Sequence, residues 1–295
     1  SHASPTPRGG GAGIVLAVLV AVAWLALTTG SQGWLAWFAM AVLGVAAVGW
    51  WDDHRPLSVR LRLAVHLVAS LVLGVGILGV PDTPAEGGVF ALAVLSSMAL
   101  VNFWNFMDGI NGLAASQAAL LGLAVAVALP GSAVGWLELA LGAACLGFLP
   151  WNLPRARVFM GDVGSGTLGL MVAAILWRGG VGDGLDWRLA LILPSAMLVD
   201  AGLTLAMRVL QGKRWWTAHR EHLYQRAVGH GLSHALVTFL YACWSATLAC
   251  AYLIGGWWGA AWAGDVLVFI AYAGGGLLWA GARLLLWRGS HGVNG

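Results

Sequence analysis

Charged residues are scarce in this sequence: they make up 9% of the chain, whereas hydrophobic residues make up 60%. Soluble globular domains carry roughly 25% charged residues, so the chain lacks the polar surface that keeps a protein in water. Several of its apolar runs approach the roughly 20 residues that cross a bilayer core of about 30 Å. The composition therefore predicts an integral membrane protein.

Cysteine is also sparse, and the three cysteines lie inside apolar runs without CxxC spacing: Cys145, Cys243 and Cys250. Small buried thiols are the ordinary reading of such positions, so they predict no metal or redox site. The first apolar run, after Arg8, is not a signal peptide, because many further spans follow it. The sequence has no internal repeat or low-complexity tail, which predicts a single domain over residues 1–295.

Apolar runs separated by Gly, Pro and polar residues predict an all-α bundle of about ten transmembrane helices. Their expected ranges are 12–29, 34–50, 63–80, 87–103, 113–130, 136–152, 165–179, 188–209, 234–255 and 263–285. One set of connections, counted with the neighbouring helix ends, carries 13 Lys and Arg residues, and the other set carries only Arg178 and Arg188. By the positive-inside rule the first set is cytoplasmic, together with both ends of this chain.

The acidic residues divide between the two sides. Those in or beside the opposite connections are expected to be solvated or helix-capping charges: Asp82, Glu86, Glu138, Asp183, Asp186 and Asp265. On the cytoplasmic side, Asp52 and Asp53 end the second predicted helix in GWWDDHRPLSVR. Adjacent carboxylates repel each other, and a divalent cation would relieve the repulsion. The alternative is neutralisation by Arg55 and Arg60 of the same loop.

A second polar motif is NFWNFMDGINGLAAS, in which Asn102, Asn105, Asp108 and Asn111 recur at intervals of three. On a helix these side chains would lie along one edge. Such an edge in an apolar segment predicts a binding site, and the alternative is a hydrogen-bond ladder between helices.

A third motif, RVFMGDVGSGTLG, places Asp162 directly before a predicted helix, whose N-terminal amides favour phosphate oxygens. Phe159 could stack on a planar base, although packing is the ordinary role of phenylalanine. Near the N-terminus, Arg8 precedes three glycines, which offers a guanidinium and exposed backbone amides to an anion. The alternative for that segment is a flexible terminus.

The loop after residue 210 is strongly basic. It contains Lys213, Arg214, His219, Arg220, Glu221, His222, Arg226, His230 and His234. It has no Cys partner and no HExxH arrangement, which argues against zinc. The charges suit phosphate and pyrophosphate groups, and the alternative is a loop that contacts anionic lipid.

In chain order, PTPRGGG, WWDDHRPLSVR, NFWNFMDGINGLAAS, VFMGDVGSGTLG and HREHLYQR resemble the polyprenyl-phosphate N-acetylhexosamine-1-phosphate transferase family over nearly the whole chain. The basic loop is most similar to the O-antigen branch. The resemblance implies transfer of an N-acetylated (deoxy)hexosamine-1-phosphate from a UDP-sugar to undecaprenyl phosphate, with release of UMP. It further implies the first membrane step of O-antigen or other surface polysaccharide assembly at the cytoplasmic face of a bacterial inner membrane. Mg²⁺ is the implied cofactor, with Mn²⁺ as a substitute, and a homodimer is expected.

The resemblance also implies individual roles. Asp162 matches the magnesium-ligand aspartate, with Asn105 beside it, and Asp52 or Asp53 matches the base that acts on the lipid phosphate. His222 matches a histidine that contacts the diphosphate or sugar. The implied substrate-binding residues are Arg8, Asn105, Asp108, Asn111, Phe159 (stacked on uracil), His219 and Arg220. Direct attack is preferred over a covalent aspartyl intermediate, which stays an alternative.

Three positions depart from the family pattern. Asn111 stands where much of the family has Asp. His219-Arg220-Glu221-His222 replaces a run of adjacent histidines, which disfavours the pentapeptide-transferase alternative. Family members usually have a further helix before PRGGG, so a missing N-terminal span is expected. A transporter, the rival from another class, would need polar residues near mid-span, whereas here they gather at helix ends.

Overall fold

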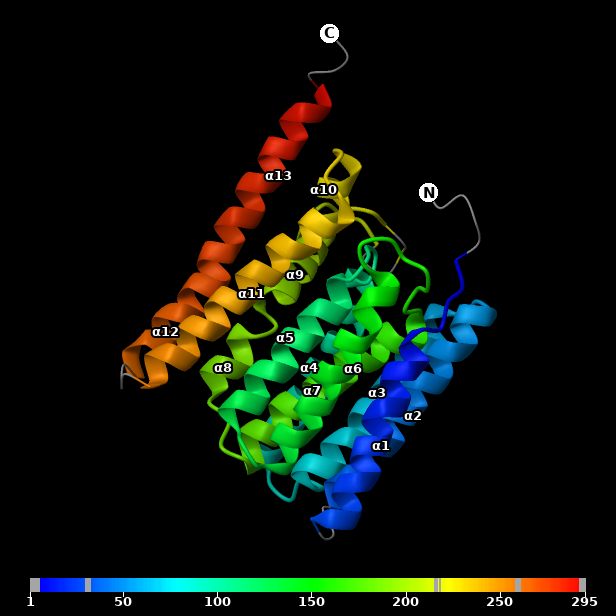
Figure 1. Ribbon diagram of the computed structural model, residues 1–295, viewed down its shortest axis with the longest axis vertical. Coiled ribbons are helices and arrows are strands. Elements are labelled where there is room, and N and C mark those ends of the chain that lie inside the picture. The colour runs from blue at the N-terminus through cyan, green and yellow to red at the C-terminus, as the bar shows by residue number, and fades with distance from the viewer. Residues whose placement is uncertain (1–5, 30–32, 215–216, 218, 258–260, 292–295) are drawn as a thin grey trace.

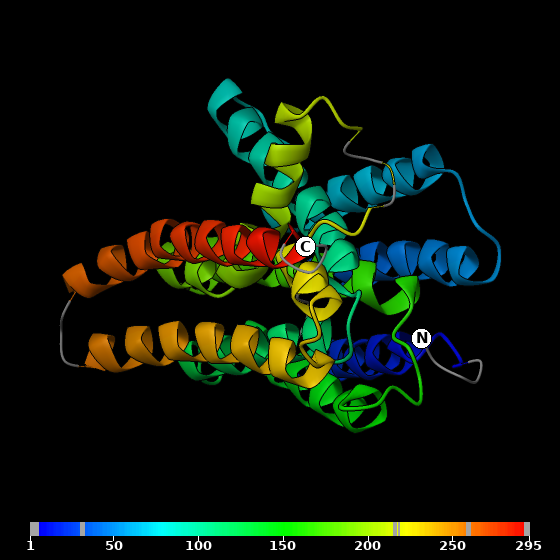
Figure 2. The ribbon, with the colours of Figure 1, turned by 90° about the horizontal axis from the view of Figure 1, so that it is seen from above.

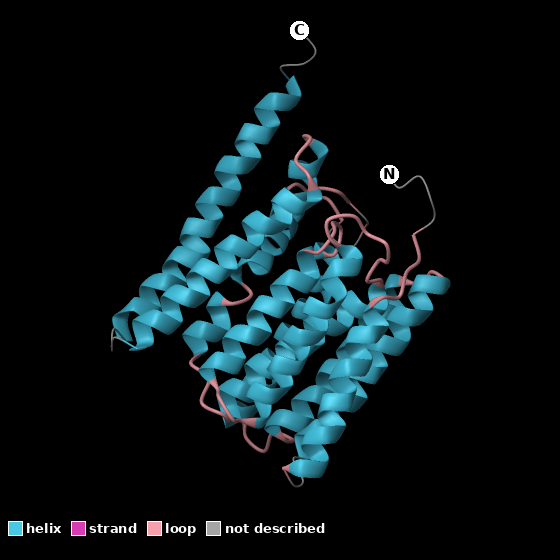
Figure 3. Ribbon diagram, viewed as in Figure 1, coloured by secondary structure: helices cyan, strands magenta, loops and turns pink. Residues whose placement is uncertain are grey.

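The computed structural model describes residues 6–29, 33–214, 217, 219–257 and 261–291. Within these residues the regular structure is entirely helical (Figure 3). The elements are α1 Gly11–Thr28, α2 Gly33–His54, α3 Val59–Leu78, α4 Pro84–Met107, α5 Leu113–Ala128, α6 Ala133–Asn152, α7 Asp162–Gly182, α8 Trp187–Ile192, α9 Ser195–Leu210, α10 Leu223–Gly229, α11 His234–Trp257, α12 Ala261–Phe269, η1 Ile270–Gly274 and α13 Gly275–His291. The predicted all-α class is confirmed.

Seven stretches of the described residues are long and apolar enough to cross a bilayer. They are Gly11–Thr28, Gly33–His54, Val59–Leu78, Pro84–Met107, Ala133–Asn152, His234–Gly256 and Trp262–Leu286, and Leu113–Ala128 is a shorter apolar helix. The protein is thus a multi-pass membrane protein. The count of ten spans and the cytoplasmic placement of both chain ends stay predictions.

α7 is the central helix of the bundle. Residues 163–175 are all buried, and α7 packs against each of α1 to α6. A helix that is apolar on every side is either surrounded by protein or exposed to lipid, and the contacts of α7 show that it is surrounded by protein. Its first turn lies so close to α1 that a Cβ on Gly11 would collide with the backbone of Gly164. This close approach sets the starts of α1 and α7 side by side.

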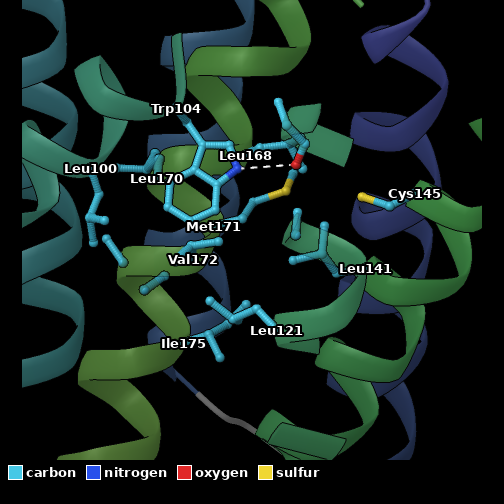
Figure 4. Packing of buried hydrophobic residues seen from close by; sticks show 14 of the residues in the cluster. Leu100, Trp104, Leu121, Leu141, Cys145, Leu168, Leu170, Met171, Val172 and Ile175 are labelled. Atoms are coloured by element: carbon cyan, nitrogen blue, oxygen red, sulfur yellow. Dashed lines mark hydrogen bonds between the residues drawn. The ribbon is translucent and has the colours of Figure 1, made fainter. Parts of the chain in front are cut away.

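The core fixes α7 against the helices that carry the polar motifs. Figure 4 shows the indole of Trp104, on α4, beside Leu168 and Met171 of α7. Trp104 is fully buried, and its Nε1 donates to the carbonyl of Ala114 on α5 at 3.4 Å. Buried indoles need such a partner for their N–H. One side chain therefore ties α4, α5 and α7 together.

The last helices form a separate layer along one side of this bundle (Figures 1 and 2). There the structure corrects two predicted elements. The range 188–209 is two helices, α8 and α9, because Pro194 lacks the N–H that would continue a single helix. The loop predicted for 210–233 contains the short helix α10. The range 263–285 is continuous but includes the π-helical turn η1.

Glu138 also corrects an expectation. It was predicted to be a solvated or capping charge, but it lies inside α6 with 0% of its surface exposed. Neither carboxyl oxygen has a hydrogen-bond partner among the described residues. A polar group buried in this way costs free energy that an apolar side chain of similar length would not.

We therefore expect Glu138→Met to raise the free energy of unfolding by about 1–3 kcal/mol. The measurement is the melting temperature of the detergent-solubilised protein, with Glu86→Gln, an exposed position on the same side of the bundle, as the control. A lower melting temperature for Glu138→Met would contradict the prediction, because it would show that the carboxyl group makes a stabilising contact.

Candidate active site

The N-terminus of α7 is capped by a carboxylate from another helix. Asp53, in the last turn of α2, accepts the backbone N–H groups of Asp162 at 3.0 Å and Val163 at 3.2 Å. A carboxylate at this end of a helix is favoured by the helix dipole. Gly161 has φ +76° and ψ 170°, and a Cβ there would collide with the Asp53 carboxylate. Glycine is thus required for Asp53 and Asp162 to meet.

The neighbouring Asp52 is held by an arginine that also reaches Asp162. Asp52 accepts the Leu57 N–H at 2.5 Å and the Arg62 Nη1 at 2.9 Å. The same Arg62 nitrogen lies 3.4 Å from Asp162 Oδ2. Arg62 therefore bridges two carboxylates that belong to different sequence motifs.

Arg62 is a site residue that the sequence motifs did not single out. Arg55 and Arg60, the expected neutralising partners of the Asp pair, are both exposed. The third helix was expected to begin at residue 63, but α3 begins at Val59. Arg62 consequently lies on the helix and is directed by its register, rather than by loop conformation.

Asn105 lies directly beside Asp162. Its Nδ2 donates to Asp162 Oδ1 at 3.0 Å and to the hydroxyl of Ser165 at 3.0 Å. Two of the residues expected to surround a metal are therefore adjacent, and the metal-ligand role of Asn105 stays a prediction. Ser165, on the first turn of α7, was not predicted.

The polar motif of α4 does not form one helical edge. α4 ends at Met107, and Asp108 is its C-terminal capping residue. Asn102 and Asn105 therefore face one pocket, and Asp108 and Asn111 face another. The expected alignment of all four side chains is wrong, because the helix stops before the last two.

The larger pocket is a cavity of about 810 Å³ at the end of the bundle where α10 lies. It is lined by Arg8, Asp53, Asp108, Gly109, Ile110, Asn111, Asn152, Phe159, Met160, Gly161, Asp162, Arg220, Gln225, Arg226, Val228, Gly229, His230 and His234. Residues from every predicted motif thus meet in one cavity. Three arginines and three carboxylates line it together.

The smaller pocket, of about 50 Å³, lies among α2, α3, α4 and α7. Its polar residues are Arg62, His66, Asn102, Asn105 and Asp162, and its apolar walls include Val59 and Leu63. His66 is buried, and its Nδ1 has no hydrogen-bond partner among the described residues. Within the described chain, Asp162 is the residue common to the linings of both pockets.

The glycine-rich segment after Arg8 runs along the loop that carries Phe159. Phe159 N–H donates to the Pro7 carbonyl at 2.9 Å, and Gly10 N–H donates to the Phe159 carbonyl at 3.0 Å. A Cβ on Gly10 would collide with neighbouring side chains. This pairing brings Arg8 to the cavity and argues against a flexible terminus for residues 7–11.

Asn152 is a cavity residue that the motifs missed. Its Oδ1 accepts the Gly112 N–H at 2.5 Å, and its Nδ2 donates to the Val158 carbonyl at 3.0 Å. Asn152 therefore links the start of α5 to the connection between α6 and α7. The available signal was a lone amide in the last turn of an apolar helix.

The two histidines named from the family pattern are not among the described residues that line the cavity. His222 is 2% exposed and stacks on Phe106 and Tyr224 at ring distances of 6.2 and 5.9 Å. Burial lowers the pKa of His222, and burial with the neighbouring His222 and Arg208 lowers the pKa of His219 to about 4. Both rings are neutral near pH 7. Their predicted substrate contacts stay predictions, whereas His230 and His234 line the cavity.

The carboxylates at the cavity are crowded. Burial raises the pKa of Asp108 well above its ordinary value, and the Asp162 and Asp53 carboxylates raise it further. Within the described residues, no three Asp, Glu, His or Cys side chains stand close enough to hold a metal ion by themselves. Mg²⁺ usually takes one or two carboxylates and completes its shell with substrate phosphates and water. This oxygen-rich, partly complete donor set fits Mg²⁺ in that mode.

Comparison with known proteins agrees with the motifs. Residues 34–180 match glycosyl transferase family 4. The chain is 31% identical to a decaprenyl-phosphate N-acetylglucosaminephosphotransferase of Mycobacterium leprae (strain TN), over 84% of this chain and 73% of the relative. It is 27% identical to a probable undecaprenyl-phosphate N-acetylglucosaminyl 1-phosphate transferase of Bacillus subtilis (strain 168), over 80% and 69%.

The chain belongs to the polyprenyl-phosphate N-acetylhexosamine-1-phosphate transferase family. The resemblance stated from the motifs is confirmed, and the transporter alternative is set aside. A phospho-N-acetylmuramoyl-pentapeptide-transferase of Thermosynechococcus vestitus is also similar, with 32% identity over 59% of this chain and 50% of the relative. This member of the family is a membrane transferase whose motif residues gather around two pockets.

Proposed function

We propose that this transferase moves an N-acetylated hexosamine-1-phosphate from a UDP-sugar to undecaprenyl phosphate and releases UMP. One observation carries the proposal: Asp162 lies between a cavity of about 810 Å³ and a polar pocket of about 50 Å³. A reaction between a large phosphorylated donor and the phosphate of a lipid needs two such pockets that meet at one point.

The large cavity suits the donor. Arg8, Arg220 and Arg226 line it, and guanidinium groups bind diphosphate oxygens through charge-assisted hydrogen bonds. Its volume lies in the range of about 300–1,000 Å³ that is typical of small-molecule sites. Phe159 lies in the same lining, where it can stack on the uracil ring, and Asn111 offers an amide beside it.

The small pocket suits the acceptor phosphate. Arg62 and His66 offer donors to an anion, and Val59 and Leu63 supply apolar walls next to them. These residues lie on α3, a candidate membrane span, so the pocket is formed beside the lipid phase. A lipid phosphate that entered here would meet Asp162 from the side opposite to the donor.

In a direct attack by the acceptor phosphate, each of these residues has a separate role. Arg62 orients the acceptor phosphate, and an oxygen of that phosphate forms a bond to the sugar-bearing phosphorus of the donor. The bond from that phosphorus to UMP breaks, and Arg220 and Arg226 hold the departing phosphate. Of the adjacent Asp52 and Asp53, Asp53 lines the cavity and would act on the reacting phosphates. Asp52 accepts a hydrogen bond from Arg62 and keeps it in place.

Magnesium fits this site. Asp162 would hold Mg²⁺, with Asp108 and Asn105 next to it, and the bound ion would neutralise diphosphate charge and stabilise the departing UMP. The excess of Lys and Arg in the connections on this side supports a cytoplasmic cavity, and the proposed location is the inner membrane of a bacterium. The proposed role is the first membrane step of O-antigen or other surface polysaccharide assembly.

A membrane assay with undecaprenyl phosphate, Mg²⁺ and a panel of UDP-sugars tests the proposal. The expected result is UMP release, with formation of a lipid-linked sugar diphosphate, for UDP-N-acetylhexosamines and their 6-deoxy forms. UDP-glucose, which lacks the acetamido group, is the control. Release only with UDP-N-acetylmuramoyl-pentapeptide would assign the alternative function, and absence of release with every donor would contradict the proposal.

A further inference from the structure

Asp200 is a buried carboxylate of α9 that lines neither of the pockets beside Asp162. It is 2% exposed. Its Oδ1 accepts the Leu223 N–H at 2.8 Å and the Trp279 Nε1–H at 3.1 Å. Its Oδ2 accepts the Tyr241 hydroxyl at 2.7 Å and the Tyr224 N–H at 3.2 Å.

These donors come from three helices other than its own: α10, α11 and α13. A fifth, the hydroxyl of Thr204 on α9, lies at 3.2 Å. Burial of a charged group is costly unless hydrogen bonds compensate for the lost water, and a satisfied network of this kind specifies a single arrangement of its members. Asp200 therefore fixes where α10 begins relative to the membrane helices.

The first turn of α10 leads directly to the cavity. The hydroxyl of Tyr224 donates to the carbonyl of Phe106 at 2.8 Å, two residues before Asp108. A Cβ on Gly109 would collide with that hydroxyl. Tyr224 is fully buried, so its position determines the end of α4 and the start of the turn that carries Asp108.

The same helix carries residues that face the donor. Gln225, Arg226 and Gly229 line the cavity. A second hydrogen bond also holds α10 in position: Arg283 of α13 donates to the carbonyl of Glu221, just before α10, at 3.0 Å. The helices α9 and α13 thus act on the cavity through α10, although none of their described residues is in its lining.

We propose that Asp200 is a positioning residue for the transfer: it holds the first turn of α10, and thereby sets Asp108 through Tyr224 and sets Arg226 against the diphosphate. This inference rests on the proposed function. Asp200 itself touches no reacting group.

Asp200→Asn tests the proposal with little change of side-chain size. The amide replaces one acceptor oxygen with an NH₂ group, which would face the N–H and O–H donors that now point at it. We expect kcat/KM for the UDP-sugar to fall about 100-fold, because small displacements of positioning groups have effects of this size. KM for undecaprenyl phosphate should stay within about twofold of wild type, as expected when one substrate's contacts are lost selectively.

A second measurement does not depend on activity. Hydrogen–deuterium exchange of the peptide that covers residues 223–229, without substrate, should be faster in Asp200→Asn than in wild type. Thr204→Val is the matched control, because it removes a donor to the same carboxylate from within α9 and leaves α10 tied. Its exchange and kinetics should change much less than those of Asp200→Asn.

A double variant separates positioning from general loss of structure. Tyr224→Phe removes only the hydroxyl contact with Phe106, and it should lower kcat/KM in the same direction. Because the two residues act in series, Asp200→Asn combined with Tyr224→Phe should lose little more than the worse single variant. Unchanged exchange in α10, or fully additive losses, would overturn the proposal. Absence of UMP release in wild type would instead refute the proposed function, and the exchange result would still decide whether Asp200 holds α10.

Discussion

Asp162→Asn is expected to lower kcat for UMP release by about 10³-fold or more. Asp162 is the described residue that lines both pockets, so its charge acts where donor and acceptor phosphates meet. Loss of metal-based charge stabilisation costs several kcal/mol of the barrier, and about 4 kcal/mol corresponds to about 10³-fold in rate. The measurement is initial UMP release at saturating donor and acceptor.

The same variant should be folded and stable. Asp162 lies near other carboxylates. Arg62 Nη1 donates to both Asp162 and Asp52, and the charge of Asp162 raises the pKa of Asp108. Removal of one charge relieves repulsion, so the melting temperature without Mg²⁺ should not fall.

Magnesium binding can be read from the same melting curves. In wild type, Mg²⁺ at about 100 times its Kd should add about 2.7 kcal/mol of stability, and Asp162→Asn should lose this gain. Asp82→Asn, an exposed change in the connection between α3 and α4, is the control and should keep both the gain and the activity. Near-wild-type activity in Asp162→Asn, or a retained Mg²⁺ effect, would remove the ion from this residue.

Helix positions were largely predictable because lipid-facing and buried residues are both apolar, so each span is a continuous run. The two exceptions have different causes, the first local and the second tertiary. Pro194 interrupts an apolar run that otherwise looks like one span. α10 has only seven residues, and the N–H groups of Leu223 and Tyr224 in its first turn donate to Asp200 of another helix. No local pattern in the sequence of α10 reveals this contact.

The candidate site shows the same division. The motifs predicted that Asp52, Asp53, Asp108 and Asp162 belong together. The last three line one cavity, whereas Asp52 is connected to Asp162 through Arg62. The motifs did not reveal that Asn105 faces the smaller pocket, because this depends on where α4 ends. Nor could they select Arg62 from three nearby arginines, because that choice depends on α3 beginning at Val59.

Arg62→Ala should lower kcat/KM for undecaprenyl phosphate by about 10- to 100-fold. Arg62 is the cation of the small pocket and touches both Asp52 and Asp162. The Arg62 side chain is 32% exposed, so water screens part of its charge, and loss of a hydrogen bond between charged groups costs about 1.5–3 kcal/mol. KM for the UDP-sugar should move little, because Arg62 does not line the large cavity. Arg60→Ala, an exposed change two residues earlier, is the matched control.

The affinity for Mg²⁺ shows whether the loss of activity in Arg62→Ala comes from a missing contact or from damage to the fold. Arg62 Nη1 lies 2.9 Å from Asp52 Oδ2 and 3.4 Å from Asp162 Oδ2, so it competes with a divalent cation for the same carboxylates. Without the guanidinium, the local potential is more negative and attraction to a cation is stronger. The Mg²⁺ concentration at the midpoint of the thermal shift should therefore fall in Arg62→Ala, although activity is lost. A protein that had lost its structure would bind Mg²⁺ more weakly, and a rise of the midpoint would show that Arg62 does not share these carboxylates with the ion.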